Sequence, residues 1–148
     1  MRSIAICSLL ALSACGLLGT RGSLHDAPSS AADLPFQAPG VYLRDPGPPE
    51  FSAYRAIVFE ADGTLYGVRD TVDIDRSVRE GGYAALKGTY KATGTTVEMR
   101  FFTPHPVGNY SSYVQTFVAE PASDRAFRVL FGADRPGSSY HSYTLQRD

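Results

Sequence analysis

Hydrophobic and polar side chains alternate in short runs from residue 40 to the end of the chain. The clearest run spans residues 95–102, where Val97, Met99 and Phe101 occupy every second position. The positions between these three are polar. Because successive side chains of a strand point to opposite faces of a sheet, this spacing predicts a strand with one buried face and one face in water.

The same alternation divides this region into short strands separated by turn residues. We predict strands at residues 40–44, 51–60, 64–70, 83–92, 95–102, 110–120, 127–131 and 140–146. Asp62-Gly63 and Thr93-Gly94 are typical of tight hairpin turns. Strong helical periodicity is absent from the sequence. These features predict an all-β domain, an antiparallel meander of about eight strands that closes into a small barrel and so leaves no exposed edge, with a β-sandwich as the alternative.

Residues 71–82 are compatible with two structures. Val72, Ile74 and Val78 lie at even positions and continue the alternation, which favours a strand. A helical turn through residues 73–80 is the alternative. Gly81-Gly82 would end either element.

The first fifteen residues, MRSIAICSLLALSAC, have the pattern of a secretory signal. Arg2 precedes an apolar run that is shorter than the roughly 20 residues needed to span a membrane. The run ends in Leu12-Ser13-Ala14-Cys15, which resembles the lipobox of bacterial lipoproteins. An ordinary signal peptide cut near Ala14 is the alternative.

The lipobox resemblance implies removal of residues 1–14 and acylation of Cys15, with palmitate among the attached chains. Two or more acyl chains make a stable membrane anchor, since each buried methylene contributes about 0.8 kcal/mol. Gly16 stands where an aspartate would favour retention at the inner membrane. We therefore expect a protein of the cell envelope, at the outer membrane if the organism is Gram-negative.

The predicted organisation is a signal peptide at residues 1–14, a lipidated cysteine with a flexible tether at residues 15–39, and a barrel domain at residues 40–148. Small residues and prolines predominate in the tether, which shows no periodicity. Leu34 and Phe36 either pack against the edge of the domain or remain in solvent.

Charge and cysteine content exclude several classes of function. The 148 residues carry a formal net charge of −1, so there is no basic excess to attract nucleic acid. Both cysteines, Cys7 and Cys15, fall within the first fifteen positions. After processing, the domain would have no disulfide, no thiol nucleophile and no cysteine metal site.

Three short patterns resemble the lipocalin-like domains common among bacterial lipoproteins. They are Gly40-x-Tyr42, Phe59-x-x-Asp62-Gly63-Thr64, and Gly88-Thr89-Tyr90 followed by Val97-x-Met99. Lipocalins carry a tryptophan in their opening motif, and this chain has Tyr42 there. The resemblance implies an eight-stranded barrel that encloses one small ligand or is filled by side chains, and the eight phenylalanines and nine tyrosines suit a filled interior.

Candidate chemistry is sparse. His105 lies in a proline-rich loop and His141 in the last predicted strand, and no nucleophile is placed beside either. Asp70, Asp73 and Asp75 form the densest acidic group, which resembles a solvated surface more than a calcium loop because it lacks the glycine and distal glutamate of such loops. We expect no catalytic residue, metal or cofactor.

Four tyrosines near the C-terminal half are candidates for binding or for packing. Tyr110 and Tyr113 fall on opposite faces of a strand, as do Tyr140 and Tyr143, so no single aromatic stripe is implied. Barrel packing is the favoured role.

The sequence therefore favours a non-enzymatic, membrane-anchored module that binds a small apolar or amphiphilic ligand. The alternative is a protein-interaction, inhibitor or accessory lipoprotein of an envelope complex. The two differ in structure, because the first needs an interior cavity and the second an exposed binding surface.

Overall fold

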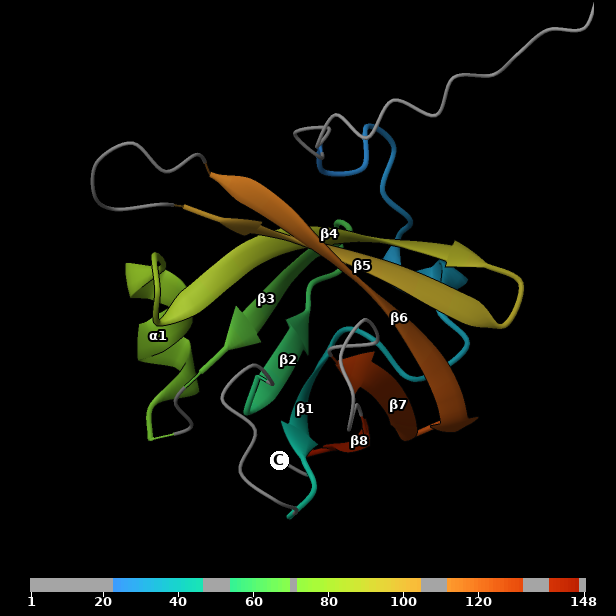
Figure 1. The fold of residues 1–148 in the computed structure, drawn as a ribbon. Helices are drawn as coiled ribbons and strands as arrows, with labels where there is room; N and C mark the ends of the chain where they lie inside the picture. The colour runs from blue at the N-terminus through green and yellow to red at the C-terminus, as the bar shows by residue number, and fades with distance from the viewer. Residues whose placement is uncertain (1–22, 47–53, 70–71, 105–111, 132–138, 147–148) are drawn as a thin grey trace, which may run out of the picture.

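The protein was examined as a computed structural model, which describes residues 23–46, 54–69, 72–104, 112–131 and 139–146 (Figure 1). Its eight strands are β1 (Gly40–Arg44), β2 (Ala56–Phe59), β3 (Thr64–Val68), β4 (Ala85–Thr93), β5 (Thr96–Thr103), β6 (Tyr113–Ser123), β7 (Ala126–Phe131) and β8 (Ser139–Leu145). One α-helix, α1 (Ile74–Glu80), and one short 3-10 helix, η1 (Ala31–Asp33), complete the described elements.

Each strand pairs antiparallel with the next along the chain, and β1 pairs with β8 to close the barrel. Met99 of β5 lies opposite Phe117 of β6, and Tyr42 of β1 lies opposite Leu145 of β8. This confirms the predicted meander and its closure, and the β-sandwich alternative is wrong. In a circle of eight strands, β5 is four strands from β1 in either direction, so these two strands lie on opposite sides of the barrel.

The predicted faces of β5 are confirmed. Val97, Met99 and Phe101 are fully buried in the barrel, and Glu98 and Arg100 lie on its outer side. Some boundaries differ from the prediction. Strand β6 continues to Ser123, with a register shift against β7 where a turn was expected, because a bulge lets the strand pass Pro121.

The segment before β4 is the helix that the pattern did not favour. The carboxylate of Asp73 caps α1 by accepting from the backbone N–H of Arg76 at 2.8 Å, and Gly81 ends the helix at a φ of 63°. Ile74 and Val78 pack on the outer side of the barrel over Ala56 and its apolar neighbours. Their spacing of four residues fits both a strand and a helix, which is why the alternation misled.

Residues 23–39, which we call the strap, belong to the stretch predicted as a tether, and in the structure they contact the barrel. Beyond its last pairing with β3, at Thr89, strand β4 pairs with β5 only, and the strap covers the edge that β3 leaves free. The backbone N–H of Ser29 donates to the carbonyl of Tyr90, and the Ser29 hydroxyl accepts from Ala92 N. Phe36 then enters the barrel, where it is 5% exposed.

Candidate functional site

The barrel interior is occupied by aromatic side chains. Neighbouring rings lie with their centroids between 4.6 and 6.4 Å apart. The rings come from Phe36, Tyr42, Tyr54, Phe59, Tyr90, Phe101, Phe117, Phe127, Phe131 and Tyr143. Gly67 leaves room for one of them, since a Cβ on it would lie 2.8 Å from the Tyr54 ring. Among the described residues, side chains fill the space in which the lipocalin resemblance placed a ligand.

Buried tyrosines direct their hydroxyl groups toward the ends of the barrel. Tyr90 donates to the carbonyl of Glu60, and Tyr143 donates to the carbonyl of Tyr54 at 2.7 Å. Burial raises the pKa of Tyr42 and of Tyr90 to about 12, and it raises the pKa of Tyr54 and of Tyr143 further. These neutral hydroxyls serve the packing of the barrel because each has a hydrogen-bond acceptor within the fold.

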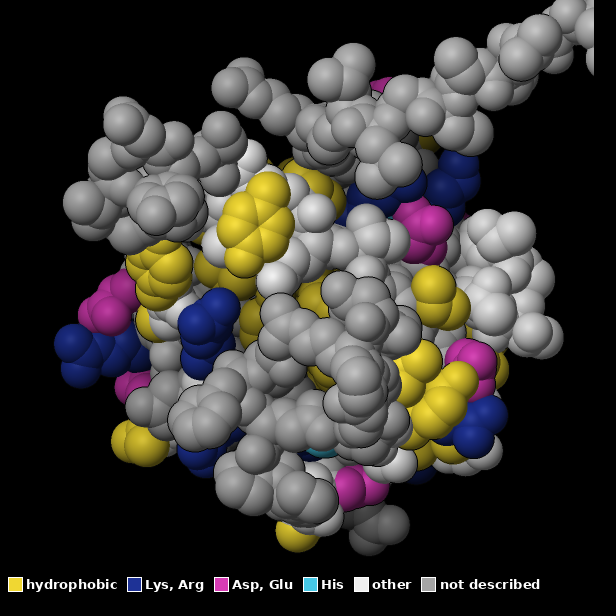
Figure 2. All heavy atoms as spheres, in the orientation of Figure 1, with side chains coloured by type: hydrophobic (Ala, Val, Ile, Leu, Met, Phe, Trp, Pro, Cys, Tyr) yellow, Lys and Arg dark blue, Asp and Glu magenta, His cyan; other side chains and the backbone are white. Residues whose placement is uncertain are grey.

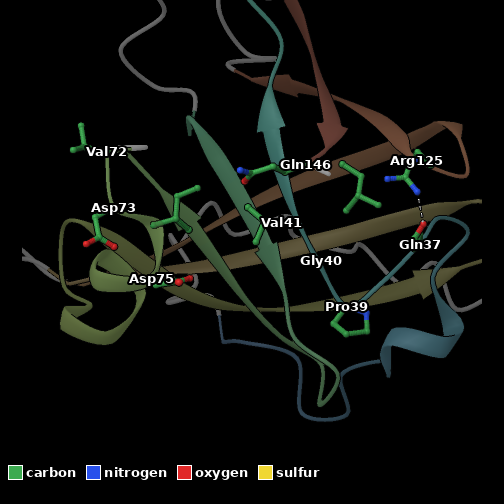
Figure 3. A pocket seen from close by; sticks show the side chains of 11 residues that line it. Gln37, Pro39, Gly40, Val41, Val72, Asp73, Asp75, Arg125 and Gln146 are labelled. Atoms are coloured by element: carbon green, nitrogen blue, oxygen red, sulfur yellow. Dashed lines mark hydrogen bonds between the residues drawn. The ribbon is translucent and has the colours of Figure 1, made fainter. Parts of the chain in front are cut away.

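A hollow lies outside the barrel, along β1 (Figure 3). We call it the β1 groove, and its volume is about 890 Å³. Its lining comes from the strap, β1, the start of α1, the β6–β7 turn and the end of β8: Gln37, Pro39, Gly40, Val41, Val72, Asp73, Ile74, Asp75, Arg125, Leu145 and Gln146. A second hollow of about 240 Å³ shares Ile74 and Asp75 with it and reaches Val58, which pairs with Val41.

The β1 groove carries opposite charges at its two ends and apolar side chains between them. Asp73 and Asp75 stand at the α1 end, and Arg125 stands at the other end, where its guanidinium donates to Gln37 Oε1 at 3.0 Å (Figure 3). Val41 lies between the two ends (Figure 3). The described lining residues include no serine, cysteine or histidine. This arrangement suits an extended ligand with apolar groups and charges of both signs.

The predicted site residues do not come together. His141 is 6% exposed, with its ring 5.7 Å from that of Phe131. Cys15, Asp70, His105 and Tyr110 lie outside the described residues.

The remaining predicted residues have separate positions. Asp73 and Asp75 belong to the start of α1 and to the β1 groove. Tyr113 is 46% exposed and Tyr140 49% exposed, whereas Tyr143 is buried, so the opposite orientation of the last two is confirmed.

His25 makes a fixed contact between the strap and the barrel. Its Nε2 lies 3.0 Å from Glu98 Oε1, and its Nδ1 lies 3.0 Å from Thr89 Oγ1. Burial disfavours ionisation of Glu98, but hydrogen bonds from His25 and Arg100 outweigh burial and hold the pKa of Glu98 below its usual value. No sequence signal marks this contact, because the partners are 64 and 73 positions away.

Comparison with models of protein families, with curated proteins and with solved structures gave no match. Within the described ranges, no helix has the length and apolar character needed to cross a membrane. The described histidines, aspartates and glutamates form no group of three or more that could hold a metal ion.

Proposed function

We propose that the protein is a lipid-anchored, non-enzymatic interaction module of the cell envelope that binds an extended polypeptide segment in the β1 groove. The observation that carries the proposal is the contrast between an interior filled with rings and an open outer groove with opposite charges at its ends. The proposal departs from the small-ligand hypothesis because the rings occupy the place of that ligand.

An extended polypeptide matches the chemistry of this groove. Its side chains can present a basic group to Asp73 and Asp75, an apolar group to Val41, and an acidic group to Arg125. Electrostatic complementarity of this kind gives register and specificity more than affinity. Apolar contact on Val41, which is partly exposed, would add affinity by removing its side chain from water.

The anchor is the second part of the proposal, and it is supported by the match of Leu12-Ser13-Ala14-Cys15 to the lipobox. We expect Cys15→Ser to leave the protein unprocessed or soluble. Metabolic labelling with palmitate measures this directly. Labelling that persists in the Cys15→Ser protein would refute the anchor.

The groove is tested by photo-crosslinking in intact cells. A crosslinking amino acid replaces Val72, which lines the groove and is 90% exposed, or Tyr140, which is 49% exposed and lies outside the groove lining. We expect a discrete product from position 72 and none from position 140.

Charge reversal connects such a product to the groove. Arg125→Glu should abolish the product from position 72, whereas Arg128→Glu, on the outer face of β7, should leave it intact. Equal products from positions 72 and 140, or a product that survives Arg125→Glu, would contradict the proposed site.

A further inference from the structure

The strap begins on the outer surface of β4 and β5. The carbonyl of Ser23 accepts from Arg100 Nη1 at 3.1 Å, and the side chain of His25 is 5% exposed between Thr89 and Glu98. In Figure 1 the blue start of the strap lies along β4 and β5, and β1 lies across the barrel from it. The chain toward Cys15 therefore leaves the domain on the side opposite the β1 groove.

The distance between this exit and the anchor is limited by chain length. Eight Cα-to-Cα steps separate Ser23 from Cys15, and a fully extended chain advances at most about 3.6 Å per residue. Whatever the conformation of residues 16–22, Ser23 lies within about 29 Å of Cys15. An acylated Cys15 would keep the exit close to the bilayer.

Exposed apolar side chains gather on the same side. Of the large hydrophobic residues that are described as exposed, Phe102 and Val118 lie on the outer face of β5 and β6, and Tyr83 lies just before β4. Their exposed fractions are between 42% and 46%. The hydroxyl of Tyr83 donates to the carbonyl of Pro104. This hydrogen bond connects the segment before β4 to the end of β5. Figure 2 shows hydrophobic side chains over the ends of β5 and β6.

Basic side chains lie among these residues. Lys87 and Lys91, the two lysines of the sequence, are both exposed on β4, and Arg100 lies beside them on β5. Glu98 is the acidic residue of this surface on β5, and it is paired with Arg100 and His25. Across the outer side of β4, β5 and β6 these three basic residues outnumber the two acidic residues, Glu98 and Glu120, in a chain whose net charge is −1.

We infer that the outer surface of β4, β5 and β6, which we call the β4–β6 face, lies against a phospholipid bilayer. This inference rests on the proposed anchor at Cys15. The lysines contact lipid phosphates, and the exposed aromatic rings enter the headgroup region, where amphipathic rings are favourable. The β1 groove, on the opposite side of the barrel, then faces away from the membrane and is open to a partner.

The test compares an exposed threonine of the β4–β6 face with an exposed threonine beside β1, two strands further round the barrel. Thr116 lies on β6 opposite Arg100, and Thr144 lies on β8 opposite Leu43 of β1. Each is replaced separately by an azide-bearing amino acid and coupled to the same fluorophore. The labelled protein is studied both as acylated by cells and as the chain from Cys15 coupled to a maleimide lipid. The second form tests orientation whether or not cells acylate the protein.

Vesicles of phosphatidylethanolamine and phosphatidylglycerol with nitroxide-labelled headgroups serve as the quencher. We expect the fluorophore at position 116 to lose most of its emission and the fluorophore at position 144 to retain most of it. Equal quenching, or stronger quenching at position 144, would overturn the inference. If cells attach no palmitate but the protein coupled to the maleimide lipid still shows stronger quenching at position 116 than at position 144, the native anchor alone would be refuted.

Charge reversal tests whether the β4–β6 face itself contacts lipid. Lys87→Glu combined with Lys91→Glu should abolish the contrast between positions 116 and 144, and Arg76→Glu combined with Arg79→Glu on α1 should not. An unchanged contrast in the lysine variant would overturn the assignment of the β4–β6 face as a lipid-binding surface.

Discussion

The two sides of the barrel share one core and differ in what they expose. The β4–β6 face carries Lys87, Lys91 and exposed apolar side chains beside the start of the strap. The side along β1 carries a groove with charges of both signs, and its apolar neighbours are covered by α1. The interior between them is filled with rings. A barrel with a filled interior can bind only on its outer surface, so its binding chemistry depends on which outward positions of each strand are polar, apolar or charged.

The largest expected effect comes from Met99→Asp, which removes the core that both sides share. Met99 is fully buried, so the new carboxylate would be desolvated and unpaired. Its cost of several kcal/mol is comparable with the total stability of such a domain, about 5–15 kcal/mol. Circular dichroism should show an unfolded chain. Thr96→Asp, at an exposed position of the same strand, is the control. A Met99→Asp protein with unchanged melting would show that this face is not the inner one.

High pH should weaken the same core through its tyrosines. The ordinary tyrosine pKa is 10.0, and burial raises the pKa of Tyr42 and of Tyr90 to about 12. Between these values the unfolded chain loses protons and the native protein keeps them, so stability falls as pH rises. The contribution is complete below pH 10 and is lost toward pH 12. Urea unfolding across this range measures it, and stability that stays constant there would contradict the burial of these hydroxyls.

Two substitutions, one that removes a ring from the strap and one that removes a ring from the β4–β6 face, compare the contributions of the buried and the exposed ring to stability. Phe36 is 5% exposed and Phe102 is 42% exposed. Phe36→Ala should lower the free energy of unfolding by about 3–5 kcal/mol, because it leaves a cavity among rings. Phe102→Ala should lower it by less than about 1 kcal/mol and should reduce contact with vesicles. Chemical denaturation measures both, and equal losses of stability would contradict the different roles of the two rings.

A smaller effect is expected from two tyrosines of β8. The buried Tyr143 hydroxyl donates to the carbonyl of Tyr54, whereas the hydroxyl of Tyr140 lies 3.4 Å from Glu120 at the surface. Tyr143→Phe should cost about 1–3 kcal/mol, since it leaves that carbonyl without its donor. Tyr140→Phe should change stability by no more than about 0.5 kcal/mol. Thermal melting of the two variants decides the matter, and a larger loss for Tyr140→Phe would reverse the assignment of the two faces of β8.

The smallest effect concerns the contact that holds the start of the strap. The pKa of Glu98 lies below its ordinary value of 4.5, so Glu98 stabilises the fold above that value and loses this contribution as pH falls through the lowered pKa. The contribution is less than about 1 kcal/mol because Glu98 is partly exposed. Glu98→Gln should make the melting temperature depend less on pH in the acid range. Glu80→Gln on α1 is the control. If the melting temperature of Glu98→Gln falls with decreasing pH as steeply as that of the unchanged protein, the contact does not contribute to stability.

Alternation of residue type made the barrel predictable, and it also limited the prediction. Val97, Met99 and Phe101 could be assigned to the inner face because a closed sheet needs one apolar face. Ile74 and Val78 could not be assigned to a helix, because a spacing of four residues fits both periods. Phe102 directly follows Phe101, so one of these two neighbours in a strand had to face outward, and this signal could have revealed an exposed ring.

The strap and the groove depend on long-range contacts that have no local pattern. Phe36 is a single aromatic residue in a stretch of small residues and prolines, and its burial follows from rings that lie elsewhere in the chain, such as Phe127 at 4.9 Å. The groove joins residues from both ends of the domain, among them Gln37 and Gln146. Such sites follow from barrel closure, which pairs β1 with β8.

Native mass spectrometry of the protein, purified from membranes without denaturation, tests most directly whether binding belongs to the outside of the barrel. A chain that begins at Cys15, carries acyl groups and holds no stoichiometric small molecule is the predicted result. A stoichiometric apolar molecule that is retained by the native fold and released on unfolding would contradict the filled interior and the account built on it.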